Sequence, residues 1–379
     1  MNVLCICYEY PPIGGGGGPV CQGICEAIVA AGHHVDVVTS AMSDLPRREV
    51  RGGVTIHRHA CRRRHRHFTT TDELLTGLRP AYRTALQLTR QIQYDLIHCH
   101  FVVPSGLVTS WLARRTGLPY LITAHGSDIP GYNRDRFGLT HRLIAPVSRR
   151  ILRHAAAVTT PSQFLRHLLQ KLTPVPVAVI PNGFTPPPAP SVPRRRRVLV
   201  VTRMFERKGV QFVVEAMRGM DPAWELCIVG DGPYLPAIKA RAAQLHVDAQ
   251  FFGYVQGQAL IDLYHSAEIF ALPSSTENFP VVLLEAMAAG CAVVTTAGTG
   301  CEEVVGPTAV CVPPENPAAL RAAFERLIAD PGQLKQLQAM GRQRVERFSW
   351  PKIGAEFEQL YRQHARSGRS SPTATEAAT

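Results

Sequence analysis

The chain contains 379 residues, of which 45% are hydrophobic, and this favours two domains with separate cores over a single domain. Its formal net charge is +12, and the excess lies in the first half. Residues 1–190 contain 21 Lys and Arg against 10 Asp and Glu, whereas residues 191–379 contain 20 against 19. A basic half favours an anionic substrate, an anionic membrane surface or nucleic acid as its partner.

No apolar stretch reaches the length of a membrane span, and the first residues lack the features of a secretory signal. Ten cysteines are present, without CxxC or zinc-finger spacing. Most of them lie in apolar runs, which is typical of reduced thiols in a core. We therefore expect a cytoplasmic protein without a metal site, and the inner face of the plasma membrane is a candidate place of peripheral attachment.

The first half alternates short apolar strands with helices. Helices are expected at residues 20–31 and 72–93, and strands at residues 3–9, 35–40, 54–59, 96–101, 120–124, 157–160 and 177–180. Short apolar strands separated by helices indicate a parallel sheet that is covered on both faces.

Five consecutive glycines, residues 14–18, follow the first strand. Glycines at such a position let the backbone approach a ligand and offer N–H groups to a phosphate, so Gly15 and Gly16 are candidate donor-binding residues. The run does not have the spacing of a dinucleotide-binding loop. The alternative is a turn without a role in binding.

His125 comes directly after the strand at 120–124, at the edge of a parallel sheet where ligands gather. Its loop also contains Gly126 and Asp128. His125 is either functional or structural, and Asp128 is either a ligand-binding residue or an ordinary helix N-cap.

The segment 186–197, rich in proline and arginine, is expected to link the two domains. The second domain should then span residues 198–348, with strands at 198–202, 226–229, 250–252, 269–272, 292–295 and 309–312. A last helix is expected at 349–366. Residues 367–379 lack an apolar pattern and are expected to be disordered.

Two cations follow the first strand of this second series. Arg203 and Lys208 lie on the loop between a strand and a helix, where they can neutralise a diphosphate leaving group without a metal. The alternative is a solvated charge run. Gly232, in the loop Gly-Asp-Gly-Pro after the next strand, is either part of a nucleotide site or a tight turn.

Two glutamates eight positions apart are the most informative feature of the chain. Pro280 suits the first position of a helix and Gly290 suits its end, so Glu277 should precede the helix and Glu285 should lie within it. An anion at that helix start would meet unpaired N–H groups, with Glu277 placed to accept hydrogen bonds from sugar hydroxyls and Glu285 to hold a ribose. The alternative is a surface pair on an amphipathic helix.

These motifs together resemble the retaining nucleotide-sugar glycosyltransferases of family 4 over about residues 1–366. The resemblance implies a GT-B fold of α/β class, in which two Rossmann-like domains face a central cleft and the last helix crosses back to the N-terminal domain. Two departures stand out, because Pro280 replaces a glycine that would offer an N–H group and Phe184 follows the Asn-Gly turn where an aspartate is usual.

By this resemblance the chain would move a hexose from a UDP-, GDP- or ADP-sugar to an acceptor hydroxyl with retention, in glycan, glycolipid or exopolysaccharide synthesis. The acceptor would be a glycan or a lipid-linked molecule. The N-terminal domain, 1–185, would bind the acceptor and the C-terminal domain the donor. Catalysis would rest on Arg203, Lys208, Glu277 and His125, without a cofactor. The residues expected to bind the donor are Gly15, Gly16, Asp128, Gly232, Asn278, Phe279, Val281 and Glu285.

Two other functions remain open at this stage. One is a nucleotide-sugar epimerase or glycan phosphorylase with the same architecture, although no motif for a pyridoxal phosphate lysine is found. The other is a binding or scaffold protein that has lost catalysis. A dense basic stretch at 57–67 favours anionic lipid over nucleic acid, because the aromatic residues that a nucleic-acid site needs are lacking there.

Overall fold

The structure is a computed structural model that describes residues 1–66, 69–132 and 134–366, without the side chains of residues 134–142. The tail expected at 367–379 lies outside the described residues. The chain divides into two compact units. Unit 1 consists of Met1–Thr160, Arg166–Ile180 and Gly354–Thr379, and unit 2 consists of Pro161–Leu165 and Pro181–Ile353.

Unit 1 is built on an eight-stranded sheet in the order β3-β4-β2-β1-β5-β6-β7-β8. The strands are β1 (Asn2–Ile6), β2 (His34–Ser40), β3 (Arg48–Arg51), β4 (Val54–His59), β5 (Leu96–His100), β6 (Tyr120–Thr123), β7 (Ala157–Thr160) and β8 (Val177–Val179). Among the described residues all pairs are parallel except β3 with β4. The parallel sheet that the sequence predicts is therefore confirmed.

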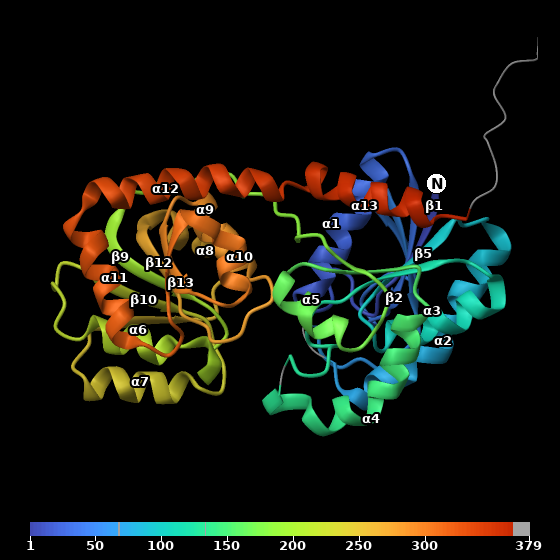
Figure 1. Cartoon of the computed structure of the whole chain (residues 1–379), viewed down its shortest axis with the longest axis horizontal. Helices are drawn as coiled ribbons and strands as arrows, with labels where there is room; N and C mark the ends of the chain where they lie inside the picture. Colours follow the sequence, from blue (N-terminus) through green and yellow to red (C-terminus); the bar gives the residue numbers. More distant parts are fainter. Residues whose placement is uncertain (67–68, 133, 367–379) are drawn as a thin grey trace, which may run out of the picture. The chain divides into compact units, whose positions relative to one another are not determined.

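Helices cover both faces of this sheet. They are α1 (Gly17–Ala30), α2 (Thr71–Gln91), α3 (Ser105–Thr116), α4 (Arg134–Arg153), α5 (Gln163–Gln170) and α13 (Trp350–His364). Figure 1 shows α1 and α13 on one side of the sheet and α2 and α3 on the other. The sheet is thus the middle layer of three, as in the Rossmann-like architecture.

The antiparallel edge strand β3 is missing from the sequence prediction. Its residues Arg-Glu-Val-Arg form no apolar run, and Val50 is 66% exposed. The pair Gly52 and Gly53, both with positive φ, forms the two-residue connection from β3 to β4. Such a connection is typical of a β-hairpin, so the signal for β3 was the turn and not the strand.

Unit 2 contains a six-stranded parallel sheet in the order β11-β10-β9-β12-β13-β14. Its strands are β9 (Arg195–Val201), β10 (Glu225–Val229), β11 (Ala249–Gly253), β12 (Ala267–Leu272), β13 (Ala292–Thr296) and β14 (Ala309–Val312). Its helices are α6 (Val210–Met217), α7 (Leu235–Gln244), α8 (Gln258–Ser266), α9 (Val281–Ala288), α10 (Gly300–Val305), α11 (Pro317–Ala329) and α12 (Pro331–Val345), with short 3-10 turns η1 (Glu206–Lys208), η2 (Gly306–Thr308) and η3 (Glu346–Phe348).

The residues of β9 alternate between two buried cores. Val198 and Val200 pack with α6, α7 and α11, whereas Leu199 and Val201 pack with α8, α9 and α10. Figure 1 shows α6 and α7 on one side of this sheet and α8 and α9 on the other. A strand that is buried on both faces explains why its sequence is a continuous apolar run.

The start of β9 differs from the prediction, which placed residues 194–197 in the linker. The strand begins at Arg195, and Arg197 donates hydrogen bonds to Glu225 at 2.6 Å and to the Ser266 hydroxyl at 2.7 Å. Its charge is therefore neutralised at the start of two adjacent inner strands, β9 and β10. From composition alone, β9 would begin at Val198. Partners that are distant in sequence allow Arg197 to belong to the strand as well.

The last helix, α13, contributes to unit 1 from Gly354 onward. The Tyr361 hydroxyl lies 2.6 Å from Nδ1 of His98 on β5, and Oε1 of Glu358 lies 3.0 Å from Nε2 of His33. The return of the last helix to the first domain, which the resemblance implies, is confirmed. None of the helices in the described part of the chain has the length and apolar composition needed to cross a bilayer.

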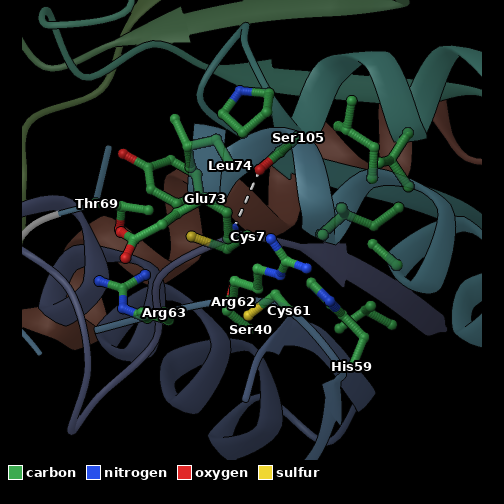
Figure 2. A pocket seen from close by; sticks show the side chains of 18 residues that line it. Cys7, Ser40, His59, Cys61, Arg62, Arg63, Thr69, Glu73, Leu74 and Ser105 are labelled. Carbon is green, nitrogen blue, oxygen red and sulfur yellow. Dashed lines mark hydrogen bonds between the residues drawn. The ribbon is translucent and has the colours of Figure 1, made fainter. Parts of the chain in front are cut away.

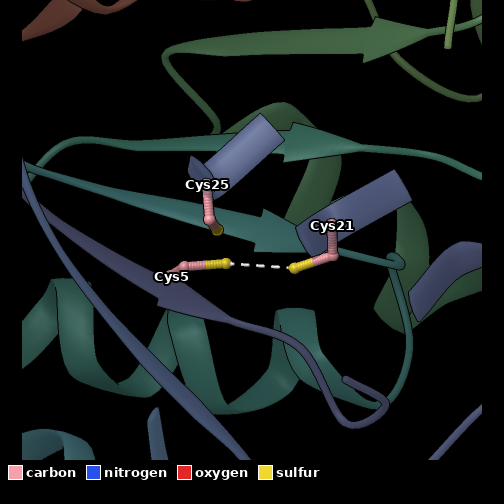
Figure 3. A group of neighbouring side chains, drawn as sticks. All are labelled: Cys5, Cys21 and Cys25. Atoms are coloured by element: carbon pink, nitrogen blue, oxygen red, sulfur yellow. Dashed lines mark hydrogen bonds between the residues drawn. The ribbon is translucent and has the colours of Figure 1, made fainter. Parts of the chain in front are cut away.

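All ten cysteines are free thiols. Cys5 on β1 and Cys21 and Cys25 on α1 place their sulfur atoms within 4.8 Å of one another, with 3.5 Å between Cys5 and Cys21 (Figure 3). Hydrogen bonds from Cys21 and Cys5 lower the pKa of Cys25. Linear spacing does not reveal this cluster, because a strand and the helix that covers it bring the three residues together.

Candidate active site

Lys208 and Glu277 form an ion pair inside unit 2. The Lys208 ammonium donates to Oε1 of Glu277, and each side chain is 10% exposed. Gly209 has φ of 72°, and a Cβ there would lie 2.2 Å from the carbonyl oxygen of Pro273. Glycine therefore lets the loop after β9 lie against the segment that leads to Glu277. The sequence prediction that these two charges belong to one site is consistent with this contact.

Hydrogen bonds tie the same two loops together. The backbone N–H of Ser275 donates to the carbonyl of Arg207 at 2.9 Å, and the Ser274 hydroxyl donates to it at 3.1 Å. These bonds fix the segments on either side of the ion pair, so Lys208 and Glu277 meet on a rigid frame.

Gly300 holds the backbone of Glu277 from another direction. Its N–H donates to the carbonyl of Glu277 at 3.1 Å, and a Cβ at Gly300 would lie 1.8 Å from the carbonyl oxygen of Asn278. The Asn278 side chain accepts a hydrogen bond from Ser162 and is 5% exposed. Sequence reasoning missed Gly300, although a Thr-Gly pair after an apolar strand is a recognisable helix start.

Glu285 lies in the second turn of α9, inside the helix as predicted. Pro280 was expected at the first position of the helix and lies one residue before it. Pro280 is the N-cap, with φ of −77° and ψ of 103°, and the helix begins at Val281. The Tyr264 hydroxyl donates to Oε2 of Glu285 at 2.7 Å. Burial raises the pKa of Glu285, and the hydrogen bond from Tyr264 opposes that shift.

Phe279 and Val281 face the core of unit 2. The Phe279 ring lies 5.6 Å from the ring of Phe348 in an edge-to-face arrangement, and Val281 packs against the same buried cluster. Both residues thereby anchor the start of α9. Their predicted role in donor binding stays a prediction.

Arg203 lies just beyond β9, with its guanidinium 5.7 Å from the centre of the Phe205 ring. The next residue, Met204, lies very close to the loop that contains Gly232, since a Cβ at Gly232 would lie 2.5 Å from the Met204 carbonyl oxygen. The Met204 N–H also donates to the carbonyl of Asp231 at 2.9 Å. Gly232 therefore positions the backbone beside Arg203, and its predicted contact with the donor remains untested.

In unit 1 the glycine loop is held by Glu9. The N–H of Gly15 donates to Oε2 of Glu9 at 2.9 Å, and a Cβ at Gly14 would lie 2.5 Å from the Glu9 side chain. Gly16 has open space around the position of a Cβ. Burial raises the pKa of Glu9, and its hydrogen bond to the Gly15 N–H lowers it. A carboxylate thus lies where the sequence predicts a phosphate.

His125 is partly buried beside a row of histidines at the ends of β5 and β6. Its Nε2 lies 3.0 Å from Nδ1 of His100, and the ring of Phe101 lies 4.4 Å away. The ring of His98 lies 4.3 Å from that of His100. Burial lowers the pKa of His125 to about 3, so its imidazole is neutral at physiological pH.

Asp128 is 6% exposed and binds the backbone of neighbouring loops. Its Oδ2 accepts from the N–H of Val102 at 2.7 Å, and its Oδ1 accepts from the N–H groups of Gly126 and His125 at 2.9 and 3.2 Å. These bonds favour the structural alternative for Asp128, which orients the His125 loop. Its predicted contact with the donor is not tested by them.

Only part of the basic stretch at 57–67 is exposed to solvent. Oδ1 of Asp36 accepts a hydrogen bond from Nε2 of His57 at 2.7 Å, Arg58 pairs with Glu49 at 2.6 Å, and His59 is buried. Arg58 and His59 are therefore not available to a lipid surface, and the predicted attachment of this stretch to anionic lipid stays a prediction for its exposed residues. Arg62 and Arg64 are exposed, and His67 lies outside the described residues.

Sequence reasoning missed Glu9 and His100 as well. Glu9 is an acid next to a glycine run, and His98 and His100 occupy alternate positions, and hence one face, of an apolar strand. In both cases the signal available in the sequence was a polar residue at the end of an apolar strand or shortly after it.

Comparison with known proteins identifies the family. The model for "Glycosyl transferase 4-like domain" matches residues 15–183, and the model for "Glycosyl transferases group 1" matches residues 186–344. The chain belongs to the group 1 glycosyltransferases. It is a GT-B member, with the α/β class expected from the sequence, and its predicted resemblance is confirmed.

Similar proteins cover almost the whole chain. An uncharacterised glycosyltransferase of Methanocaldococcus jannaschii is 28% identical over 96% of this chain and 98% of its own length. The glycogen synthase of Mycobacterium tuberculosis is 27% identical over 95% of this chain and 94% of its own. The structure of sucrose-phosphate synthase from Thermosynechococcus elongatus superposes with a TM-score of 0.80 at 26% identity, covering 96% of this chain and 99% of that one.

Proposed function

We propose that this glycosyltransferase moves a hexose from a nucleoside-diphosphate sugar to an acceptor hydroxyl with retention of configuration. Its place would be in glycan, glycolipid or exopolysaccharide synthesis. The observation that carries the proposal is the buried contact between Lys208 and Glu277, in the same unit as Arg203 and Glu285.

A buried ion pair is costly to build, because desolvation of both charges opposes folding. Hydrophobic residues of similar size would serve stability as well. The presence of Lys208 and Glu277 at this buried position is therefore better explained by chemistry than by folding. The ammonium suits a departing diphosphate, and the carboxylate suits the hydroxyls of the sugar next to it.

The other predicted residues have compatible surroundings. The carboxylate of Glu285 is fixed by Tyr264 and would hold the ribose with its second oxygen. Arg203 would add a second positive charge to the leaving diphosphate. The neutral imidazole of His125 would contact the sugar without adding charge. With two cations supplied by the protein, no divalent metal is needed for leaving-group departure, and the reaction would proceed by same-face attack.

A thermal-shift panel of UDP-, GDP- and ADP-sugars tests the proposal first. At a hundred times its Kd, a donor would stabilise the protein by about 2.7 kcal/mol. For a unit of this size that corresponds to a Tm increase of roughly 5–11 °C. Donor hydrolysis or transfer should then be lost in Lys208→Ala and kept in Lys335→Ala, a change of an exposed lysine on α12 of the same unit.

The result separates the alternatives. A Tm increase without turnover would favour a non-catalytic nucleotide-sugar-binding protein. Epimerised donor without transfer would favour an epimerase. If no donor raises the Tm and none is hydrolysed, the proposal is wrong.

A further inference from the structure

Three buried cysteines of unit 1 converge on one point in its core. Cys5 lies on β1, and Cys21 and Cys25 lie on α1, the helix that covers it. Their sulfur atoms all lie within 4.8 Å of one another, and those of Cys5 and Cys21 are 3.5 Å apart. Figure 3 shows the three side chains pointing toward a common centre. Among the side chains that the structure describes, no other group of three Cys, His, Asp or Glu residues converges in this way.

The backbone holds these cysteines in fixed positions. Cys21 and Cys25 are four residues apart, so both project from the same face of α1. Cys5 lies in an inner strand that is paired with β2 and β5. The helix α13 packs closely on α1, because a Cβ at Gly354 would lie 2.7 Å from Cβ of Ala27. The strand and the helix therefore present three sulfur atoms on a frame that is formed before any ligand binds.

The spacing of the sulfur atoms suits a metal ion. Bonds of about 2.3 Å from one metal ion to three sulfurs require those sulfurs to lie about 3.8–4.0 Å apart. The observed separations, from 3.5 Å for Cys5 and Cys21 to at most 4.8 Å, bracket this value. A disulfide of about 2.05 Å would need Cys5 and Cys21 to move much closer and would leave Cys25 outside the bond. The arrangement therefore favours one ion shared by three thiolates over a disulfide.

Other cysteines of the chain show what an ordinary core thiol does. Cys291 in unit 2 donates to the carbonyl of Tyr264 at 3.2 Å. Cys7, two residues after Cys5, donates to the carbonyl of Glu9 at 2.8 Å. Its side chain lines a small pocket together with residues of α2 and does not belong to the group (Figure 2). In the group itself sulfur contacts sulfur, which packing of separate thiols does not require.

A tyrosine beside the three cysteines lacks a hydrogen-bond partner. Tyr10 is fully buried, and its hydroxyl has no partner in the described part of the chain. Burial raises the pKa of this tyrosine, and the nearby Cys25, Cys21 and Cys5 raise it further, so the hydroxyl lies near these sulfurs. Buried hydroxyls are nearly always hydrogen-bonded. Thiolates around a cation would supply the missing acceptor, since buried groups next to a metal site commonly donate to the ligands of the metal.

We propose that Cys5, Cys21 and Cys25 bind a single thiophilic metal ion, Zn²⁺ or Cu⁺, in the core of unit 1. Both are ions that thiolate ligands select. On binding, each thiol releases its proton to solvent and its sulfur bonds to the ion, while the Tyr10 hydroxyl donates to one of the sulfurs.

The ion has a structural role. All three sulfur ligands are buried beneath α1, out of reach of a substrate, so the ion stabilises unit 1 and takes no part in transfer. The site is thus independent of the proposed function. It departs from the expectation of a chain without a metal site, because linear spacing does not contain the approach of α1 to β1.

Metal uptake by the full chain tests the proposal. The reduced protein is incubated without oxygen just below its Tm, with Zn²⁺ in one sample and Cu⁺ in another. A weak chelator then removes ions from surface histidines, and the remaining metal is measured by mass spectrometry. At least one sample should retain one ion per chain. At a thousand times its Kd the ion should raise the Tm by roughly 8–16 °C.

Two variants and a matched control locate the ion. Cys25→Ala should retain about a tenth of the metal or less. Cys99→Ala should retain all of it, because Cys99 is equally buried on β5 and lies outside the group. Tyr10→Phe keeps all three sulfurs, and it should lower the metal affinity about 10- to 100-fold, as the loss of a group next to a ligand does.

Three results would overturn the proposal. The first is that neither ion is retained, and the second is that Cys25→Ala retains as much metal as the unaltered chain. The third is a Cys5–Cys21 disulfide in air together with no metal uptake by the reduced protein, which would show a redox pair instead. If Cys25→Ala fails to fold, Tyr10→Phe decides the matter, and an unchanged affinity in that variant would refute the site.

Discussion

Replacing Lys208 by Met separates the catalytic from the structural contribution of the buried ion pair. Each partner is 10% exposed, so Lys208→Met leaves the carboxylate of Glu277 buried without its counter-charge. Breaking one half of such a pair costs about 3–5 kcal/mol. Unit 2 has roughly 180 residues, for which 1 kcal/mol changes the Tm by about 2–4 °C, so the Tm should fall by roughly 6–20 °C.

The double variant Lys208→Met/Glu277→Gln makes the test decisive. With both charges removed, no uncompensated ion remains, and most of the lost stability should return. Turnover should not return, because loss of the group that stabilises the leaving diphosphate costs about 100- to 1000-fold in rate.

Two assays on the same preparations give the answer: thermal unfolding followed by circular dichroism, and transfer at saturating donor. A double variant that regains both stability and turnover would show that the pair serves folding alone. An unchanged Tm in the single variant would refute the view that the two charges depend on each other.

Further outcomes are expected from other parts of the structure. Glu285→Gln should mainly weaken binding of the nucleoside diphosphate in calorimetry, whereas Glu277→Gln should leave that binding nearly intact and lower turnover; identical behaviour would contradict the division of roles. Burial lowers the pKa of His98 and His125 to about 3 and that of His100 well below its usual value, whereas the unfolded chain takes up these protons near pH 6.5. Stability is therefore full above about pH 6.5 and should fall by up to about 4 kcal/mol for each pH unit below it, as measured by urea unfolding at pH 7.5 and 5.5. A chelator should leave transfer unchanged, and activity that returns only with magnesium or manganese would exclude the metal-independent mechanism. Co-sedimentation with anionic vesicles should be measurable at low salt and lost at high salt, since Arg62 and Arg64 are exposed; binding that salt does not change would contradict an electrostatic attachment.

The strands of both parallel sheets were predictable because burial on two faces leaves an apolar run for each. The edge strand β3 and the first residues of β9 were harder to predict. β3 is short, polar and exposed, and β9 begins with arginines whose partners, Glu225 and Ser266, are far away in sequence. Local composition cannot contain information about such partners.

The site shows the same limit. The charged residues Lys208, Glu277 and Glu285 could be identified from their positions beside strands and helices. Their partners could not be identified. The contact of Glu285 with Tyr264 depends on how α9 packs against α8, and the contact of Glu277 with Gly300 depends on how segments after two separate strands pack. Glu9 is the clearest example, because the glycine run predicts an anion and the structure provides that anion from the chain itself.

The position of α13 also has a consequence for how the protein is made. Residues from both ends of the described chain meet in unit 1, where the Arg366 N–H donates to the carbonyl of Asp95 at 3.1 Å and Tyr361 contacts His98. A ribosome adds about 5–20 residues per second, so roughly 20–70 s pass between synthesis of β1 and of α13.

During that time unit 2 can fold completely, while the face of unit 1 around His98 has no cover. The half-made protein therefore exposes apolar and imidazole surface on unit 1. A nascent chain that is stalled after residue 353 should contain a protease-resistant unit 2 and a protease-sensitive unit 1, so the first unit to be synthesised is the last to become stable.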